Sequence, residues 1–214
     1  MTLHIVGHVK KLKRVGLSIP SFDEGTEFLS LICYSPESPP PFGLSLKSPS
    51  RLFAIIICIN RYKASDKVPN LYGCVNDGRE FQGFLENKLN VPDSHICWCS
   101  DEEATYEKIM CLLTTAADDL ISLFARGSDF RSGDPIILFY AGHGGRSRAK
   151  PTSSSDILKM HATHDGNIEL LCPHDIDTPG VDQKIIHGIP DFVFGNLLDT
   201  VAANYGGNVV RLLC

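Results

Sequence analysis

The sequence has no apolar run that approaches the ~20 residues needed to cross a membrane, although 43% of its 214 residues are hydrophobic. The mean hydropathy is -0.01, as in an ordinary globular protein. The stretch from Thr2 to Val9 is interrupted by His4, Gly7 and His8, so we expect no signal peptide. These absences predict a protein without a membrane partner that is located in the cytoplasm or the nucleus.

Positive charge is also scarce. The 20 Lys and Arg residues are outnumbered by 25 Asp and Glu, which gives a net charge of -5 and a pI near 5.9. The one dense basic segment, Lys10 to Arg14, is interpreted as a solvated tail. A nucleic-acid partner is therefore not expected.

The chain lacks the Cys-x-x-Cys spacing of zinc and redox sites, although it contains eight cysteines. Five of them lie on or beside apolar segments: Cys58, Cys74, Cys97, Cys99 and Cys111. This pattern predicts reduced, buried thiols that pack as small hydrophobic residues. We also considered a transition-metal site formed by His161, His164, Cys172 and His174. Their spacing matches no zinc pattern, so we predict no metal site.

The first fifty residues differ in composition from the rest. Residues 1–50 hold six of the thirteen prolines, with serines between them, which indicates a flexible or polyproline-like extension. From residue 51 to 214 the hydrophobic pattern becomes regular, which indicates one folded domain.

Within this domain, short β-rich runs alternate with helical patterns. We predict strands at 52–59, 95–99, 136–140, 168–171 and 208–213, and helices that begin near residues 77, 105 and 191. Thr105 is the expected N-cap of a long helix that reaches Phe124. The alternation predicts an α/β fold built from parallel β-α-β units with helices on both faces of the sheet.

The clearest functional signal is His143, which follows an apolar run within a glycine-rich stretch. Ile136 to Tyr140 is short, β-rich and followed by Gly142, as expected for a buried strand. His143 then lies in a loop beyond the carboxyl end of that strand, where a rigid sheet commonly positions catalytic groups. A loop histidine without any function is the alternative.

Six ordered phrases over residues 52–213 resemble the caspase-like cysteine peptidases, in particular metacaspases of the fungal type. The phrases are Leu52 to Tyr62, Leu71 to Asp77, Ala104-Thr105, Tyr140 to Gly145, Leu171 to Asp175, and Ile189 to Asp191 with the strand from Asn208. The resemblance implies a caspase-like three-layer sandwich, with a mainly parallel sheet, helices on both faces, and the C-terminal strands missing. It also implies a cysteine-type endopeptidase that acts on peptides or proteins.

In this resemblance His143 is the catalytic histidine, and the Gly144 backbone N–H is one donor to the oxyanion. The family nucleophile is the cysteine of an Asp-x-Cys-His-Ser-Gly type motif that follows the last strand. In this chain that strand reaches Leu213 and is followed by Cys214. Either Cys214 replaces the nucleophile, or the chain lacks one, as a truncated peptidase or as a catalytically inactive caspase-like module that binds partners. The spacing from His143 exceeds the roughly 50 residues typical of caspases, so we expect an insertion within 146–166.

Asp77 has two interpretations. It could be the N-cap of a helix, which is worth about 1 kcal/mol. The resemblance implies instead an acidic wall of the S1 pocket that selects arginine or lysine at P1, although the second acid of that pocket is absent here. Many metacaspases need calcium, but only scattered carboxylates follow the histidine motif. These are Asp156, Asp165, Asp175 and Asp177. We therefore predict no strong calcium site and no other cofactor, and the oligomeric state stays open.

Overall fold

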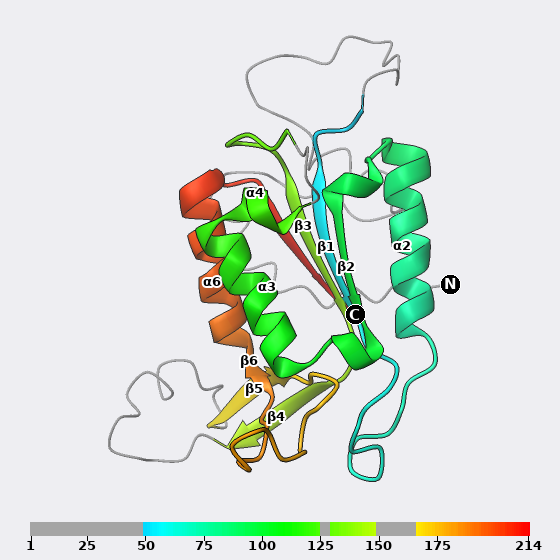
Figure 1. Cartoon of the computed structure of the whole chain (residues 1–214), viewed down its shortest axis with the longest axis vertical. Helices are drawn as coiled ribbons and strands as arrows, with labels where there is room; N and C mark the ends of the chain where they lie inside the picture. The colour runs from blue at the N-terminus through cyan, green and yellow to red at the C-terminus, as the bar shows by residue number, and fades with distance from the viewer. Residues whose placement is uncertain (1–48, 125–128, 149–165) are drawn as a thin grey trace.

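The computed structural model describes residues 49–124, 129–148 and 166–214 (Figure 1). The predicted extension over residues 1–50 lies almost wholly outside the described residues. The same holds for most of the expected insertion within 146–166.

A four-stranded parallel sheet forms the centre of the domain, with the strand order β2-β1-β3-β7. Its strands are β1 (Phe53–Cys58), β2 (Ile96–Ser100), β3 (Ile136–Ala141) and β7 (Val209–Leu213). Every residue of β1 and β3 is buried. Such strands are covered on both faces, which is why they read as continuous apolar runs rather than as alternating ones.

Helices cover both faces of this sheet (Figure 1). One hydrophobic cluster joins the sheet to α2 (Cys74–Leu89), and the other joins it to α3 (Tyr106–Asp118), α4 (Leu120–Leu123) and α6 (Asp191–Tyr205). The predicted α/β fold, with a mainly parallel sheet and helices on both faces, is confirmed. In the described part of the chain, no helix has the length and apolar character that a membrane span requires.

The start of α2 corrects one interpretation of Asp77. The N-cap of α2 is Gly73, and Asp77 lies within the first turn of the helix. The N-cap interpretation of Asp77 was therefore wrong. The motif Leu71 to Asp77 contains a glycine that precedes the helix by one residue, and this glycine, not a side-chain acceptor, marks the helix start.

The predicted long helix from Thr105 is two helices. Thr105 is the N-cap, as predicted, and its Oγ1 accepts a hydrogen bond from the Lys108 N–H at 3.3 Å. The helix stops at Asp119, whose φ of -147° is extended. The Asp119 carboxylate then accepts from the Ser122 N–H at 3.3 Å and begins α4. The prediction from periodicity overlooked Asp119, a residue type that caps helices and can therefore interrupt an apolar helical repeat.

A second, three-stranded sheet lies beyond the end of β3 (Figure 1). It contains β4 (Gly144–Arg148), β5 (Asn167–Leu171) and β6 (Ile189–Pro190), all antiparallel. The prediction that 168–171 is another strand of a parallel unit was wrong. A parallel neighbour needs a crossover of a dozen or more residues, whereas β4 follows β3 after only two residues and turns away from the main sheet.

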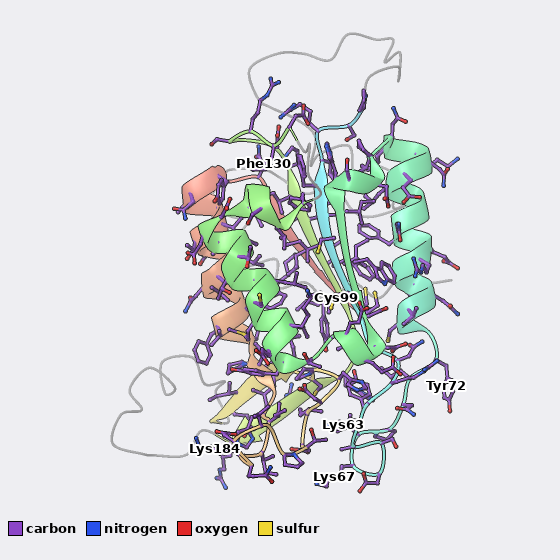
Figure 2. The ribbon with its side chains drawn as sticks, viewed as in Figure 1. Lys63, Lys67, Tyr72, Cys99, Phe130 and Lys184 are labelled. Atoms are coloured by element: carbon purple, nitrogen blue, oxygen red, sulfur yellow. The ribbon has the colours of Figure 1, made fainter. Side chains whose placement is uncertain are left out.

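The described cysteines are free thiols, and their burial follows the elements they occupy. Cys58 and Cys99 are buried (Cys99 is labelled in Figure 2), and Cys74 and Cys97 are half-buried, in keeping with packing as small hydrophobic residues. Cys111 is exposed, so its predicted burial was wrong. Cys111 lies on α3 between the buried positions of the helix, on the face turned to solvent.

Candidate active site

The carboxyl ends of β1, β3 and β7 bring the sequence-predicted groups to one edge of the main sheet. The Cys214 N–H donates to the Tyr140 carbonyl at 2.9 Å, and the Gly142 N–H donates to the Cys214 carbonyl at 3.4 Å. Cys214 therefore lies directly beside Tyr140 and Gly142, in the segment that leads into His143. Parallel strand ends meet at one edge, which explains how residues so distant in sequence come together.

The imidazole of His143 is held by a backbone carbonyl. Its Nε2 lies 2.8 Å from the carbonyl oxygen of Pro69, in the loop that follows β1. A carbonyl oxygen only accepts, so Nε2 carries the proton in this bond and Nδ1 has the free lone pair of the neutral ring. The arrangement selects one tautomer and leaves Nδ1 as the basic nitrogen.

The backbone of His143 is fixed on both sides. Its N–H donates to the Tyr62 hydroxyl at 2.7 Å. Its carbonyl accepts from the Tyr140 hydroxyl at 3.1 Å and from the Cys172 N–H at 3.0 Å. The Tyr140 hydroxyl also lies 3.0 Å from the Cys172 carbonyl. These bonds tie the histidine to β3 and to the end of β5.

Gly144 is the first residue of β4 and is exposed. It lies in a strand, opposite Leu171, rather than in the glycine-rich turn that the sequence suggested. A Cβ at this position would meet only the Leu170 carbonyl oxygen, at an ordinary distance of 3.7 Å. Space alone does not demand a glycine here, so any role of Gly144 in catalysis depends on its N–H.

Cys214 is exposed as a residue and carries a free thiol, although neighbouring atoms partly cover its sulfur. Burial of the sulfur and the nearby Asp77 carboxylate both raise the pKa of the Cys214 thiol. A neighbouring negative charge opposes thiolate formation, in contrast to the cationic surroundings that activate reactive cysteines. The candidate nucleophile therefore needs a base to take its proton.

Two further thiols share this edge, and the sequence reasoning treated both only as core residues. Burial, and next the Asp77 carboxylate, raise the pKa of the Cys74 thiol, which begins α2. Burial raises the pKa of Cys58, at the end of β1, well above its ordinary range, with smaller contributions from Cys74 and Asp77. The sequence held a signal for both positions, because Cys58 ends a strand of the main sheet and Cys74 begins the next helix.

Comparison with known proteins identifies the family. Residues 53–193 match the family model described as "Metacaspase, peptidase C14 domain". This chain belongs to the metacaspase family. The resemblance inferred from six ordered phrases of sequence is confirmed, and with it membership of a family of cysteine peptidases.

The curated relatives agree with this assignment. The chain is 27% identical over 163 residues to "Metacaspase-1" of Arabidopsis thaliana, which covers 73% of the chain and 40% of that protein. It is 31% identical over 149 residues to "Metacaspase-5" of Trypanosoma cruzi (strain CL Brener), which covers 69% of the chain and 30% of that protein. The chain therefore spans less than half the length of these relatives. A crystal structure from Geobacter sulfurreducens has a TM-score of 0.45 and 17% identity, covering 77% of this chain and 49% of that one.

The described residues that were considered as metal ligands are hydrogen-bonded to the protein or buried. His174 Nδ1 donates to the Arg61 carbonyl at 2.7 Å, and Cys172 is buried. Asp175 accepts from the Tyr106 N–H at 2.8 Å, which ties it to the start of α3. Over residues 49–124, 129–148 and 166–214, no group of three or more His, Cys, Asp or Glu side chains could hold a metal ion. His161, His164, Asp156 and Asp165 lie outside the described residues, so the prediction about calcium in this metacaspase stays a prediction.

The effect of Asp77 on the thiol gives a direct prediction. Replacing Asp77 with asparagine removes the negative charge that raises the pKa of Cys214, so that pKa should fall and alkylation at neutral pH should become faster. Iodoacetamide labelling of Cys214 across pH 6–10, read by peptide mass spectrometry, measures the shift. Asp118→Asn, an exposed carboxylate on α3, is the matched control. An unchanged or upward-shifted profile in Asp77→Asn would contradict the assigned cause.

Proposed function

We propose that this metacaspase chain carries the catalytic histidine and the specificity acid of a cysteine endopeptidase that acts on proteins. His143 is the general acid and base, and a thiol at the end of β7 is the nucleophile, which in this sequence is Cys214. The carrying observation is the 2.8 Å bond between His143 Nε2 and the Pro69 carbonyl. That bond leaves Nδ1 as the nitrogen that can accept a proton.

The chemistry follows from these groups. Nδ1 takes the proton of the thiol, and the resulting thiolate attacks the scissile carbonyl carbon to form a tetrahedral oxyanion. The Gly144 N–H is one donor to that oxyanion. The imidazolium then returns the proton to the leaving amine, and a thioester remains that water hydrolyses with His143 as the base. Because burial and Asp77 oppose the thiolate, the ion pair with His143 supplies the stabilisation that the surroundings of Cys214 lack.

Asp77 supports a preference for a basic residue at P1. It lies at the same sheet edge as Cys214, since its carboxylate acts on that thiol, and it is half-buried in the first turn of α2. A carboxylate in this position attracts the guanidinium of arginine or the ammonium of lysine.

A pair of fluorogenic peptides that differ only at P1 tests this function. The peptide with arginine should be cleaved, and the peptide with aspartate should not. The assay is run with and without calcium, since no described residue decides that dependence. An irreversible P1-arginine ketone should label Cys214, as identified by mass spectrometry. Absence of both cleavage and labelling in the folded chain would leave a caspase-like module that binds without cutting.

A further inference from the structure

Two buried tyrosines meet at the backbone of the Gly142-His143 pair, and the proposed chemistry assigns no role to either. Tyr62 is 3% exposed and lies in the loop after β1, whereas Tyr140 is 2% exposed and lies on β3. A buried hydroxyl needs a hydrogen-bond partner. Both hydroxyls lie within hydrogen-bond distance of the backbone of His143.

The contact of Tyr62 with His143 is twofold. The Tyr62 oxygen accepts the His143 N–H at 2.7 Å. The tyrosine ring also packs on the imidazole, with ring centroids 5.0 Å apart and planes tilted by 43°. The hydrogen bond fixes the position of the His143 backbone, and the ring contact limits the rotation of the imidazole.

The loop that supplies Tyr62 also supplies the carbonyl that orients the imidazole. Tyr62 and Pro69 belong to the segment between β1 and α2. This segment is closed on itself, because the Tyr62 N–H donates to Asn70 Oδ1 at 2.8 Å and the Leu71 N–H donates to the Asn60 carbonyl at 2.7 Å. His143 is thus held at its amide and at Nε2 by one loop. A displacement of Tyr62 would move both contacts together.

Gly142 shows how closely the hydroxyls approach. A Cβ at Gly142 would lie 2.9 Å from the Tyr140 oxygen and 3.1 Å from the Tyr62 oxygen. Both distances are shorter than ordinary contacts of a Cβ atom, so a side chain there would push the hydroxyls away. The glycine before the histidine is needed for the tyrosines and not only for the approach of a substrate.

We propose that Tyr62 is a positioning residue for His143, holding its backbone amide and its ring so that Nε2 stays on the Pro69 carbonyl and Nδ1 remains the basic nitrogen. Tyr140 completes the clamp by donating to the His143 carbonyl at 3.1 Å. The role in turnover rests on the proposed peptidase function, whereas the effect on the tautomer and position of His143 does not.

The phenols do not titrate in the working range. Burial raises the pKa of Tyr62 and of Tyr140 well above the ordinary value for a tyrosine. We therefore expect both hydroxyls to stay protonated at neutral pH.

Tyr62→Phe keeps the ring and removes the acceptor, so it separates packing from the hydrogen bond. It should lower kcat by about 10- to 100-fold with little change in KM. In 15N NMR of the whole chain, the His143 amide signal should move upfield and the preference for the Nε2–H tautomer should weaken. Tyr106→Phe, a more exposed tyrosine on α3, is the control and should change neither readout.

The NMR and kinetic readouts fail separately. If the unaltered chain cleaves nothing but Tyr62→Phe still changes the His143 signals, the peptidase function fails and the positioning role stands. If His143 signals and kcat are unchanged in a folded Tyr62→Phe protein, the positioning role is overturned. Should Tyr62→Phe not fold, Asn70→Ala removes the support of Tyr62 and should give a smaller shift in the same direction. Unchanged His143 signals in Asn70→Ala would also overturn the inference.

Discussion

Replacement of His143 by alanine should abolish peptide cleavage, with kcat/KM lowered by about 10²- to 10⁴-fold. Without the imidazole nothing takes the proton of Cys214, whose pKa is raised by burial and by Asp77. Nothing returns a proton to the leaving amine either. The fold should survive, because the backbone bonds of residue 143 to Tyr62 and Tyr140 do not require the imidazole. Steady-state cleavage of the P1-arginine peptide measures the loss.

The matched control is His187→Ala, an exposed histidine in the loop before β6. It should retain full turnover. A double variant, His143→Ala with Cys214→Ser, should be no slower than either single variant, because two groups that act as one unit lose their effect together. Turnover that persists in His143→Ala, or losses that multiply in the double variant, would remove His143 from the proposed mechanism.

The sequence predicted the frame of this site well, for physical reasons. The central strands are long runs of Ile, Leu and Phe, because parallel strands under helices on both faces have no polar side. The carboxyl end of such a strand has to open onto a loop, so His143 could be located from the run before it. Cys214 could be located by the same argument from β7.

The contacts that orient the imidazole could not be predicted in this way. They come from Tyr62 and Pro69, in a loop without periodicity whose shape depends on distant hydrogen bonds such as that from the Asn60 N–H to Asp101 Oδ1 at 2.7 Å. The second sheet was also predicted wrongly, because the apolar run of β5 does not reveal whether its neighbouring strands are parallel or antiparallel. The effect of the Asp77 carboxylate on Cys214 could not be predicted either, because it depends on how α2 packs on the main sheet, which the local sequence does not encode.

That packing depends on Gly78, and its replacement by alanine should destabilise the domain. A Cβ at Gly78 would lie inside the contact distance of Cys58 Sγ and 3.0 Å from the Trp98 ring. Gly78 is buried, and the side chains of Cys58, at the end of β1, and of Trp98 would have to move to admit a Cβ there. Overpacking of this kind costs about 1–3 kcal/mol and outweighs the roughly 1 kcal/mol that alanine gains over glycine in a helix.

Thermal unfolding should detect the change, at about 2–4 °C in Tm per kcal/mol for a domain of this size. Gly83→Ala is the control on the same helix, because a Cβ there meets only Asn87 Nδ2 at an ordinary 3.7 Å. It should raise Tm slightly or leave it unchanged. A Gly78→Ala protein at least as stable as Gly83→Ala would show that α2 does not approach β1 this closely.

A double-mutant cycle separates the clash with sulfur from the clash with the indole. Cys58→Ala removes Sγ and should restore part of the stability lost in Gly78→Ala, with a coupling of about 0.5–3 kcal/mol, while the contact with Trp98 remains. We expect the clash in Gly78→Ala to push α2 away from the main sheet. This displacement would also carry Asp77 away from Cys214. The pKa of the Cys214 thiol should therefore fall in Gly78→Ala and return toward its original value in the double variant. Stability and thiol chemistry would then be linked through Gly78, the buried glycine of α2.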